Sequence, residues 1–178
     1  MTAVSSAQAH ARRSPETTRE RVVTWQDPLA SASQAAGADG LTYMRRIAAG
    51  EVPPPPIAVL LRMQPVDLEF GRAAFEGEPG EEHYNPIGVV HGGYAATLLD
   101  SVMGCAVHTT LEAGEGYTTV GFEVKLVRPL AAGMVVRAEG EVVHRGRRQA
   151  TTEARIVDQA SEKLLAHATG TCLIVELI

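Results

Sequence analysis

The sequence predicts an α+β fold in which a curved antiparallel sheet surrounds one central helix. Residues 91–109 form a run of small and apolar residues of helical length with hardly any polar face. Such a helix has to be covered on nearly all sides. Two short strand-like segments precede the run, and four segments with a period of two residues follow it. A curved sheet provides the cover and leaves one edge free to pair with a second copy.

The composition is that of one domain with an extension. The 178 residues are 45% hydrophobic and 21% charged, with a formal net charge of −5. This charge argues against a partner such as nucleic acid or an anionic membrane, since both need a broad basic surface. Cys105 and Cys172 are expected to be reduced core residues. With neither a signal-like segment nor a long apolar run, we expect a cytoplasmic protein.

Residues 1–56 are expected to form an N-terminal extension. The first 20 residues are polar, and we expect this part to be disordered. Within 41–50 the apolar residues recur at helical spacing, which predicts a short helix that ends at Gly50. The prolines at 53–56 predict a stiff, extended spacer. Residues 57–178 then form the main domain.

The other elements of the main domain follow from local patterns. Residues 57–77 predict a short apolar turn and a hairpin around Phe70 and Gly71, and 78–88 predict a loop. From Gly116 onward the pattern predicts a four-strand antiparallel meander over 117–129, 134–145, 149–158 and 163–175. In the last strand Ala168 and Cys172 are expected on the inward face.

The central helix carries two features suited to chemistry. Gly92 and Gly93 lie at its start, where free N–H groups and the helix dipole could stabilise an oxyanion, so the Gly92 N–H is a candidate donor. Asp100 lies among apolar residues, and the residues one turn away offer it no partner. Burying an unpartnered carboxylate costs free energy, so a catalytic role would explain why it is there. It is a candidate general base or nucleophile. The alternatives are tight packing at the glycines and an ion pair between Asp100 and the sheet.

Spacing along the helix predicts the assembly. Gly92 and Asp100 are about 12 Å apart at a rise of ~1.5 Å per residue. They cannot both contact one carbonyl group from the same chain. If both act, they come from two chains related by a two-fold axis. We therefore expect a homodimer with two shared sites, and a dimer of dimers stays open.

The motif formed by Asn85, His91-Gly92-Gly93 and Asp100 resembles that of the hotdog-fold acyl-CoA thioesterases. The similarity is to the phenylacetic-acid-degradation (PaaI-type) branch of the 4-hydroxybenzoyl-CoA thioesterase-like superfamily, and it covers about residues 57–175. It implies a hotdog fold and hydrolysis of an aryl- or medium-chain acyl-CoA to the free acid and CoA at a dimer interface. No cofactor is implied, because coenzyme A is part of the substrate.

The resemblance also implies roles for single residues. Asn85 would hydrogen-bond the thioester or the water, although an Asn-Pro pair also suits a plain turn. His91 would orient the loop or serve only as a structural hydrogen-bonding group. Thr119, or else Thr118, would position the water, and Gly93 would border the substrate.

Two further groups are candidates for binding substrate. Arg145, Arg147 and Arg148 cluster at a turn, where they could bind the phosphates of coenzyme A or simply be solvated. The acyl group could contact Met63, Leu60 and the helix face at 98–103, and these residues could equally be plain core.

Other chemistries lack their motifs. The histidines show no spacing typical of a metal site, and neither a dinucleotide-binding glycine loop nor G-x-S-x-G occurs. A hotdog dehydratase or hydratase would carry a different His/Asp or His/Glu pattern. The remaining alternative is a non-catalytic acyl-CoA-binding hotdog protein that senses or carries its ligand. The presence of Asp100 favours turnover.

Overall fold

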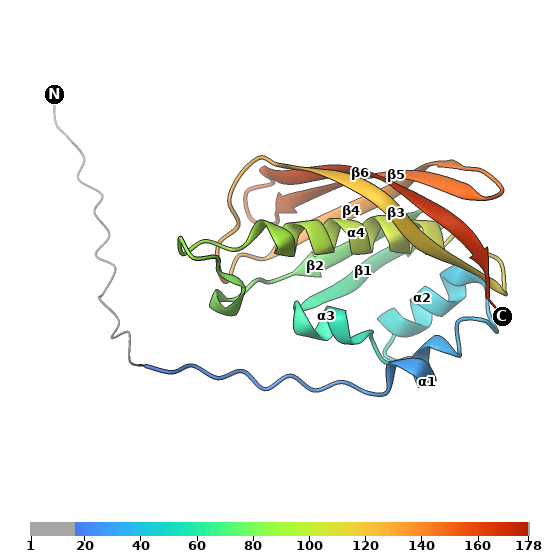
Figure 1. Ribbon diagram of the computed structural model, residues 1–178, viewed down its shortest axis with the longest axis horizontal. Coiled ribbons are helices and arrows are strands. Elements are labelled where there is room, and N and C mark those ends of the chain that lie inside the picture. The colour runs from blue at the N-terminus through green and yellow to red at the C-terminus, as the bar shows by residue number, and fades with distance from the viewer. Residues whose placement is uncertain (1–16, 178) are drawn as a thin grey trace, which may run out of the picture.

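A single curved sheet wraps around a long helix in the computed structural model, which describes residues 17–177 (Figure 1). The sheet is antiparallel, and its strands lie in the order β1-β2-β4-β5-β6-β3. Their bounds are β1 Met63–Glu69, β2 Arg72–Gly77, β3 Glu115–Leu126, β4 Val136–Arg145, β5 Gln149–Asp158 and β6 Leu164–Glu176. The helix α4 (Gly92–His108) lies in the curve of the sheet. The predicted α+β hotdog fold is confirmed.

The predicted order of the last four strands is wrong in one respect. β4, β5 and β6 form a meander, but β3 pairs with β6 and not with β4. The other side of β4 is taken by β2. Two-residue periodicity identifies a strand without identifying its neighbour, and the connection 127–135 is longer than the roughly two to five residues of a hairpin loop. As a result, β3 lies at an edge of the sheet.

The helix α4 is covered by its own chain on most, but not all, sides. The side chains that face the sheet are fully or almost fully buried, among them Leu98, Leu99, Val102 and Ala106. A strip of smaller residues is only partly buried: Gly93, Ala96, Thr97, Asp100 and Ser101. This strip leaves one side of the helix accessible.

In the N-terminal extension, the helix at 40–48 packs against β1 and α4 (Figure 1). The predicted helix is α2 (Gly40–Ala48), which begins after Asp39, whose carboxylate accepts a hydrogen bond from the Thr42 N–H. Two short helices were not predicted, α1 (Pro28–Ala32) and α3 (Pro56–Leu60). A single 3-10 turn, η1 (Glu81–His83), follows β2. Most of the segment predicted to be disordered, residues 1–16, lies outside the described residues.

Candidate active site

Asp100 lies on the accessible side of α4, and its carboxylate has a partner on β3. The Thr119 hydroxyl donates a 2.9 Å hydrogen bond to Asp100 Oδ1. A β-bulge follows at once, because the pairing of β3 with β6 shifts between Thr119 and Gly121. Bulges often re-aim a side chain next to a functional site. Within residues 17–177, no basic side chain pairs with Asp100.

Two polar side chains that sequence analysis missed lie close to this carboxylate. Tyr117 covers Gly104, where an added Cβ would lie 2.6 Å from the tyrosine hydroxyl. Burial raises the pKa of the Cys105 thiol to about 12, and that of Tyr117 well above its ordinary value. Both groups therefore keep their protons at neutral pH. The position of Tyr117 could have been inferred, because it lies two residues before Thr119 on one strand face. Cys105 is five residues after Asp100, a spacing that does not predict a shared helix face.

The start of α4 presents one free backbone donor. The Gly93 N–H donates to His91 Nδ1 at 2.8 Å, so His91 caps the helix. The Gly92 N–H has no hydrogen-bond partner among residues 17–177. An added Cβ at Gly92 would lie 2.6 Å from the Leu126 side chain, so the backbone passes close under β3 at this point. The Gly92 N–H is thus an open donor at the positive end of the helix dipole.

Asn85 orders the loop that leads to the helix. Its side-chain oxygen accepts hydrogen bonds from the backbone N–H groups of Ile87 (3.1 Å) and Val89 (3.2 Å). The loop is further fixed by the His91 N–H, which donates to the His83 carbonyl at 2.8 Å. The side-chain NH2 group of Asn85 has no hydrogen-bond partner among residues 17–177, so the predicted turn and the predicted ligand contact are compatible.

The two halves of the predicted site lie far apart within one chain. The Gly92 N–H is at the first turn of α4, and Asp100 follows about 12 Å further along at ~1.5 Å per residue. The structure therefore brings Thr119 to Asp100 and His91 to Gly93, but it does not bring Gly92 to Asp100.

Known proteins share both the sequence and the fold of this region. The model of the family described as Thioesterase superfamily matches residues 87–164. Human Acyl-coenzyme A thioesterase 13 is 30% identical over 113 residues, which cover 64% of this chain and 80% of that protein. The chain belongs to the thioesterase superfamily. The prediction of a thioester hydrolase is thereby confirmed at the level of the family.

Solved structures agree with this assignment. A phenylacetic acid degradation-related protein from Ralstonia eutropha JMP134 aligns with a TM-score of 0.68 and 29% identity, over 74% of this thioesterase and 98% of that chain. The PaaI protein of Escherichia coli aligns with a TM-score of 0.65 over 85% of this thioesterase and all of that chain. Because the identity to the Escherichia coli protein is only 20%, this similarity shows a shared fold and nothing more. The predicted resemblance to PaaI-type proteins is confirmed.

The basic turn of the thioesterase lies at the same level of the sheet as Asp100. Arg145 pairs in the strand ladders with Ala150, then Cys172, then Thr119, a span of about 14 Å at ~4.8 Å per strand. The Arg145 guanidinium is occupied by Glu115 at 2.9 Å and by the Gly146 carbonyl. Arg147 and Arg148 are exposed, and neither forms an ion pair within the described chain. Thr118, next to Thr119, is exposed.

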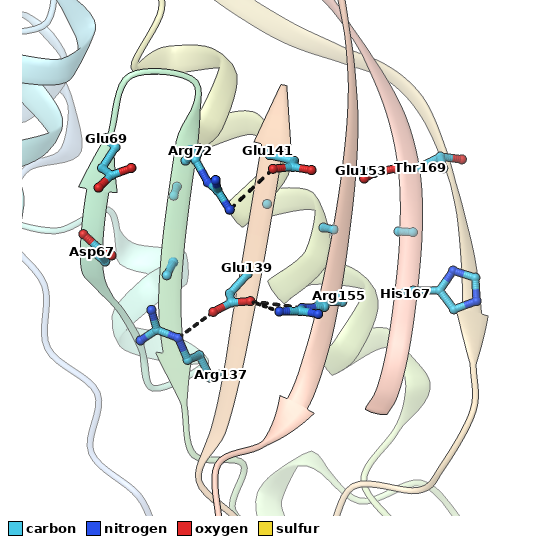
Figure 2. Close-up of a pocket in the computed structure, with 15 residues that line it drawn as sticks. Asp67, Glu69, Arg72, Arg137, Glu139, Glu141, Glu153, Arg155, His167 and Thr169 are labelled. Atoms are coloured by element: carbon cyan, nitrogen blue, oxygen red, sulfur yellow. Dashed lines mark hydrogen bonds and ion pairs between the residues drawn. The ribbon is translucent and has the colours of Figure 1, made fainter. Parts of the chain in front are cut away.

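A charged groove of about 650 Å³ crosses the outer face of the sheet of the thioesterase, on the side away from α4 (Figure 2). Glu139 accepts hydrogen bonds from Arg137 (2.9 Å) and Arg155 (2.8 Å), which lower the pKa of its carboxyl group. None of the predicted site residues lines this groove. Carboxylates outnumber arginines in its lining, and it is separate from the Asp100 site.

Residues 17–177 contain neither a cluster of metal ligands nor a membrane-spanning helix. No group of three or more His, Cys, Asp or Glu side chains is placed to hold a metal ion. No helix in this range is long and apolar enough to cross a membrane.

Proposed function

We propose that this thioesterase hydrolyses acyl-CoA thioesters with aryl or medium-chain acyl groups, at two equivalent sites that are each shared by two copies of the chain. The observation that carries the proposal is the separation of Asp100 from the open Gly92 N–H on one helix. In a pair of antiparallel α4 helices around a two-fold axis, Asp100 of one copy faces Gly92 of the other. Each copy then supplies half of each site.

The edge strand β3 supports a dimer of this kind. β3 pairs with β6 on one side and with no strand of the described chain on the other. Along it, Val120, Phe122 and Leu126 are 66%, 41% and 58% exposed. An apolar, unpaired strand edge favours pairing with another chain. The opposite edge, β1, is contacted by α2 and α3. Pairing of two β3 strands would continue the sheet and bring the accessible sides of the two α4 helices together.

In the proposed reaction, water attacks the carbonyl carbon of the thioester while Asp100 takes its proton. Negative charge develops on the carbonyl oxygen, which accepts a hydrogen bond from the partner's Gly92. The carbon–sulfur bond then breaks, and the thiolate of CoA leaves and takes up a proton. Thr119 holds the carboxylate of its own chain in position, and the partner's Asn85 and the partner's His91 position the thioester.

Direct attack by Asp100 on the carbonyl is the second route for the same groups. It would form an anhydride between the carboxylate and the acyl group, which water then hydrolyses. A single turnover in water labelled with heavy oxygen tests for direct attack. Label found in the Asp100 carboxylate demonstrates direct attack, whereas label only in the acid product is expected both for attack by water and for an anhydride that water opens at its acyl carbon.

The phosphates of coenzyme A are assigned to the basic turn. Arg147 and Arg148 are the cations available there, and Arg145 supports the turn through Glu115. Thr118 and the partner's Gly93 are assigned to the path between this turn and Asp100. Replacing Arg147 and Arg148 by Glu should raise KM for acyl-CoA and leave kcat nearly unchanged.

Mixing two inactive variants tests the shared site. Gly92→Pro removes the N–H while Pro suits the first helical position, and Asp100→Asn removes the base. In a mixed dimer one site carries both defects and the other carries neither. Unfolding and refolding the two variants together should therefore restore turnover, up to about half of the wild-type rate in each mixed dimer. Gly92→Ala, which keeps the N–H and adds the same Cβ beside the flexible end of Leu126 as proline does, is the matched control and should stay active.

The outcomes separate the competing functions. A mixture as inactive as its parents contradicts the shared site. If the wild-type chain binds acyl-CoAs without releasing free thiol from any aryl or alkyl member of a panel, hydrolysis is contradicted. The non-catalytic sensor or carrier would then be the better description.

A further inference from the structure

An apolar cavity of about 280 Å³ lies between the N-terminal extension and α4. One wall comes from the extension, where Ala32 of α1, Ile47 of α2 and the prolines at 53–55 line it. The opposite wall is formed by Met63 and Phe75 from the first hairpin. The cavity therefore lies between the extension and the first hairpin, which follows it directly in the sequence.

The floor of this cavity adjoins the candidate catalytic carboxylate. Ser101, the residue after Asp100 on α4, lines the floor, and so does Cys105 one turn further on. Tyr117, which lies close to Asp100, lines it as well. The cavity therefore lies beside Asp100, although this carboxylate does not itself line it.

The lining favours an uncharged, apolar occupant. It includes no Asp, Glu, Lys or Arg side chain. Burial lowers the pKa of His108, the one lining residue that could become cationic near neutral pH, so its ring is neutral there. The thiol and the phenol at the floor also keep their protons. A charged headgroup would lose its hydration without gaining a partner.

We propose that this cavity receives the acyl group of the thioester and that the N-terminal extension sets the length of chain accepted; this rests on the proposed function. A water-sized group takes up about 30 Å³, so the cavity holds on the order of nine carbon-sized groups. That capacity fits a medium-chain acyl group or one aromatic ring with a short arm. Of the residues predicted for an acyl pocket, Met63 lines the cavity, whereas Leu60 is 47% exposed and Leu98 and Met103 belong to the core.

The test is a chain-length profile of kcat/KM, measured by thiol release from acetyl-, butyryl-, hexanoyl-, octanoyl-, decanoyl- and dodecanoyl-CoA. Ala32→Trp narrows the cavity at an exposed position. It should lower kcat/KM for the longest accepted chain by about tenfold, as expected when two methylene groups are excluded. Acetyl-CoA turnover should stay within about twofold of wild type, which also shows that the variant is folded. Ala30→Trp, on the same helix but outside the cavity, is the matched control.

A second variant changes the cavity in the opposite direction. Ile47→Ala enlarges it and should shift the preferred chain to a longer one, whereas Leu41→Ala, on the same helix but outside the cavity, should not. An unchanged profile in both cavity variants overturns this inference and leaves the proposed function standing. Absence of thiol release by the wild-type chain from every member of the series overturns the proposed function and this inference with it.

Discussion

The hydroxyl of Thr119 donates a hydrogen bond to Asp100 Oδ1 at 2.9 Å and joins the edge strand β3 to the accessible side of α4. This contact fixes one carboxylate oxygen, and the other has no hydrogen-bond partner within the described range 17–177. Two predictions concern the two members of this pair.

Replacing Asp100 by Asn should lower kcat at least about 100-fold, because an amide can neither take a proton nor attack a carbonyl. The fold and the dimer should persist, since the amide oxygen can still accept the hydrogen bond from Thr119. Thiol release measures the rate, and circular dichroism with light scattering checks the fold and the dimer. Turnover close to that of wild type would contradict the assigned role.

Replacing Thr119 by Ala should lower kcat by about tenfold, because a hydrogen bond to a charged group is lost and the carboxylate becomes free to rotate. Thr119→Ser keeps the hydroxyl and should restore most of the rate. Thr118→Ala, at the exposed neighbouring position, is the control that should change little. Equal losses in the Ala and Ser variants would show that the methyl group matters and the hydroxyl does not.

A charge on the edge of β3 should separate the dimer. Val120→Lys places an ammonium group at a position that is 66% exposed in the single chain and buried if two β3 strands pair. Sedimentation should show a shift toward monomer, and activity should fall with it. Val143→Lys, at a similarly exposed position on β4, should leave both unchanged. A fully active monomer would contradict the shared site.

The stability of the chain should fall on mild acidification because of His108. Burial lowers the pKa of this ring below its ordinary value of 6.5. Its ring neighbours, Tyr43 and Tyr117, both have raised pKa values and stay neutral in this range. The unfolded chain therefore binds a proton below about pH 6.5 that the folded chain does not bind. This contribution to stability is complete above pH 6.5 and decreases as the pH falls toward the pKa of the folded state.

The His108→Phe variant checks this dependence, because it keeps an aromatic ring without a titrating group. Urea unfolding at about pH 7.5 and about pH 5.5 should show a smaller loss of unfolding free energy in the variant than in wild type. Identical losses would mean that the ring does not titrate in this window.

Gly40 at the start of α2 should tolerate no side chain. An added Cβ would lie 1.7 Å from the backbone carbonyl oxygen of His108, so the extension meets the end of α4 backbone to backbone. Gly40→Ala should lower the free energy of unfolding by about 1–3 kcal/mol, as overpacking does elsewhere. Gly37→Ala, where an added Cβ meets nothing within 4 Å, is the control. A Gly40→Ala variant as stable as the control would contradict this packing.

The local elements could be predicted from the sequence because their causes are local. The apolar run of 91–109 and the turn at Phe70 and Gly71 carry their own periodicity and turn chemistry, and both were confirmed. The neighbour of β3 could not be predicted, because pairing depends on which edge is left after β2 has joined β4. For the same reason Asp100 and Thr119 were each predicted, but the hydrogen bond between them depends on where the whole strand lies.

The cavity beside Asp100 could not be predicted from the sequence, for a different reason. Its walls combine the prolines at 53–55, the first hairpin and the helix, and nothing in any one segment shows that they meet. Met63 was predicted as a possible contact of the acyl group, whereas Ala32 and Ile47 lie in an extension to which no chemical role was assigned.

The bulge at Val120 shifts the alternation of side chains between the two faces of β3 by one residue. Before it, the odd-numbered residues Tyr117 and Thr119 face α4, and after it the even-numbered Val124 and Leu126 do. A period of two without this extra residue could direct Thr119 to Asp100 or Leu126 to Gly92, but not both. One inserted residue therefore lets a single strand serve both ends of the same helix. Deleting Val120 should move the side chains at one end of the strand to the opposite face of the sheet, while those at the other end keep their face.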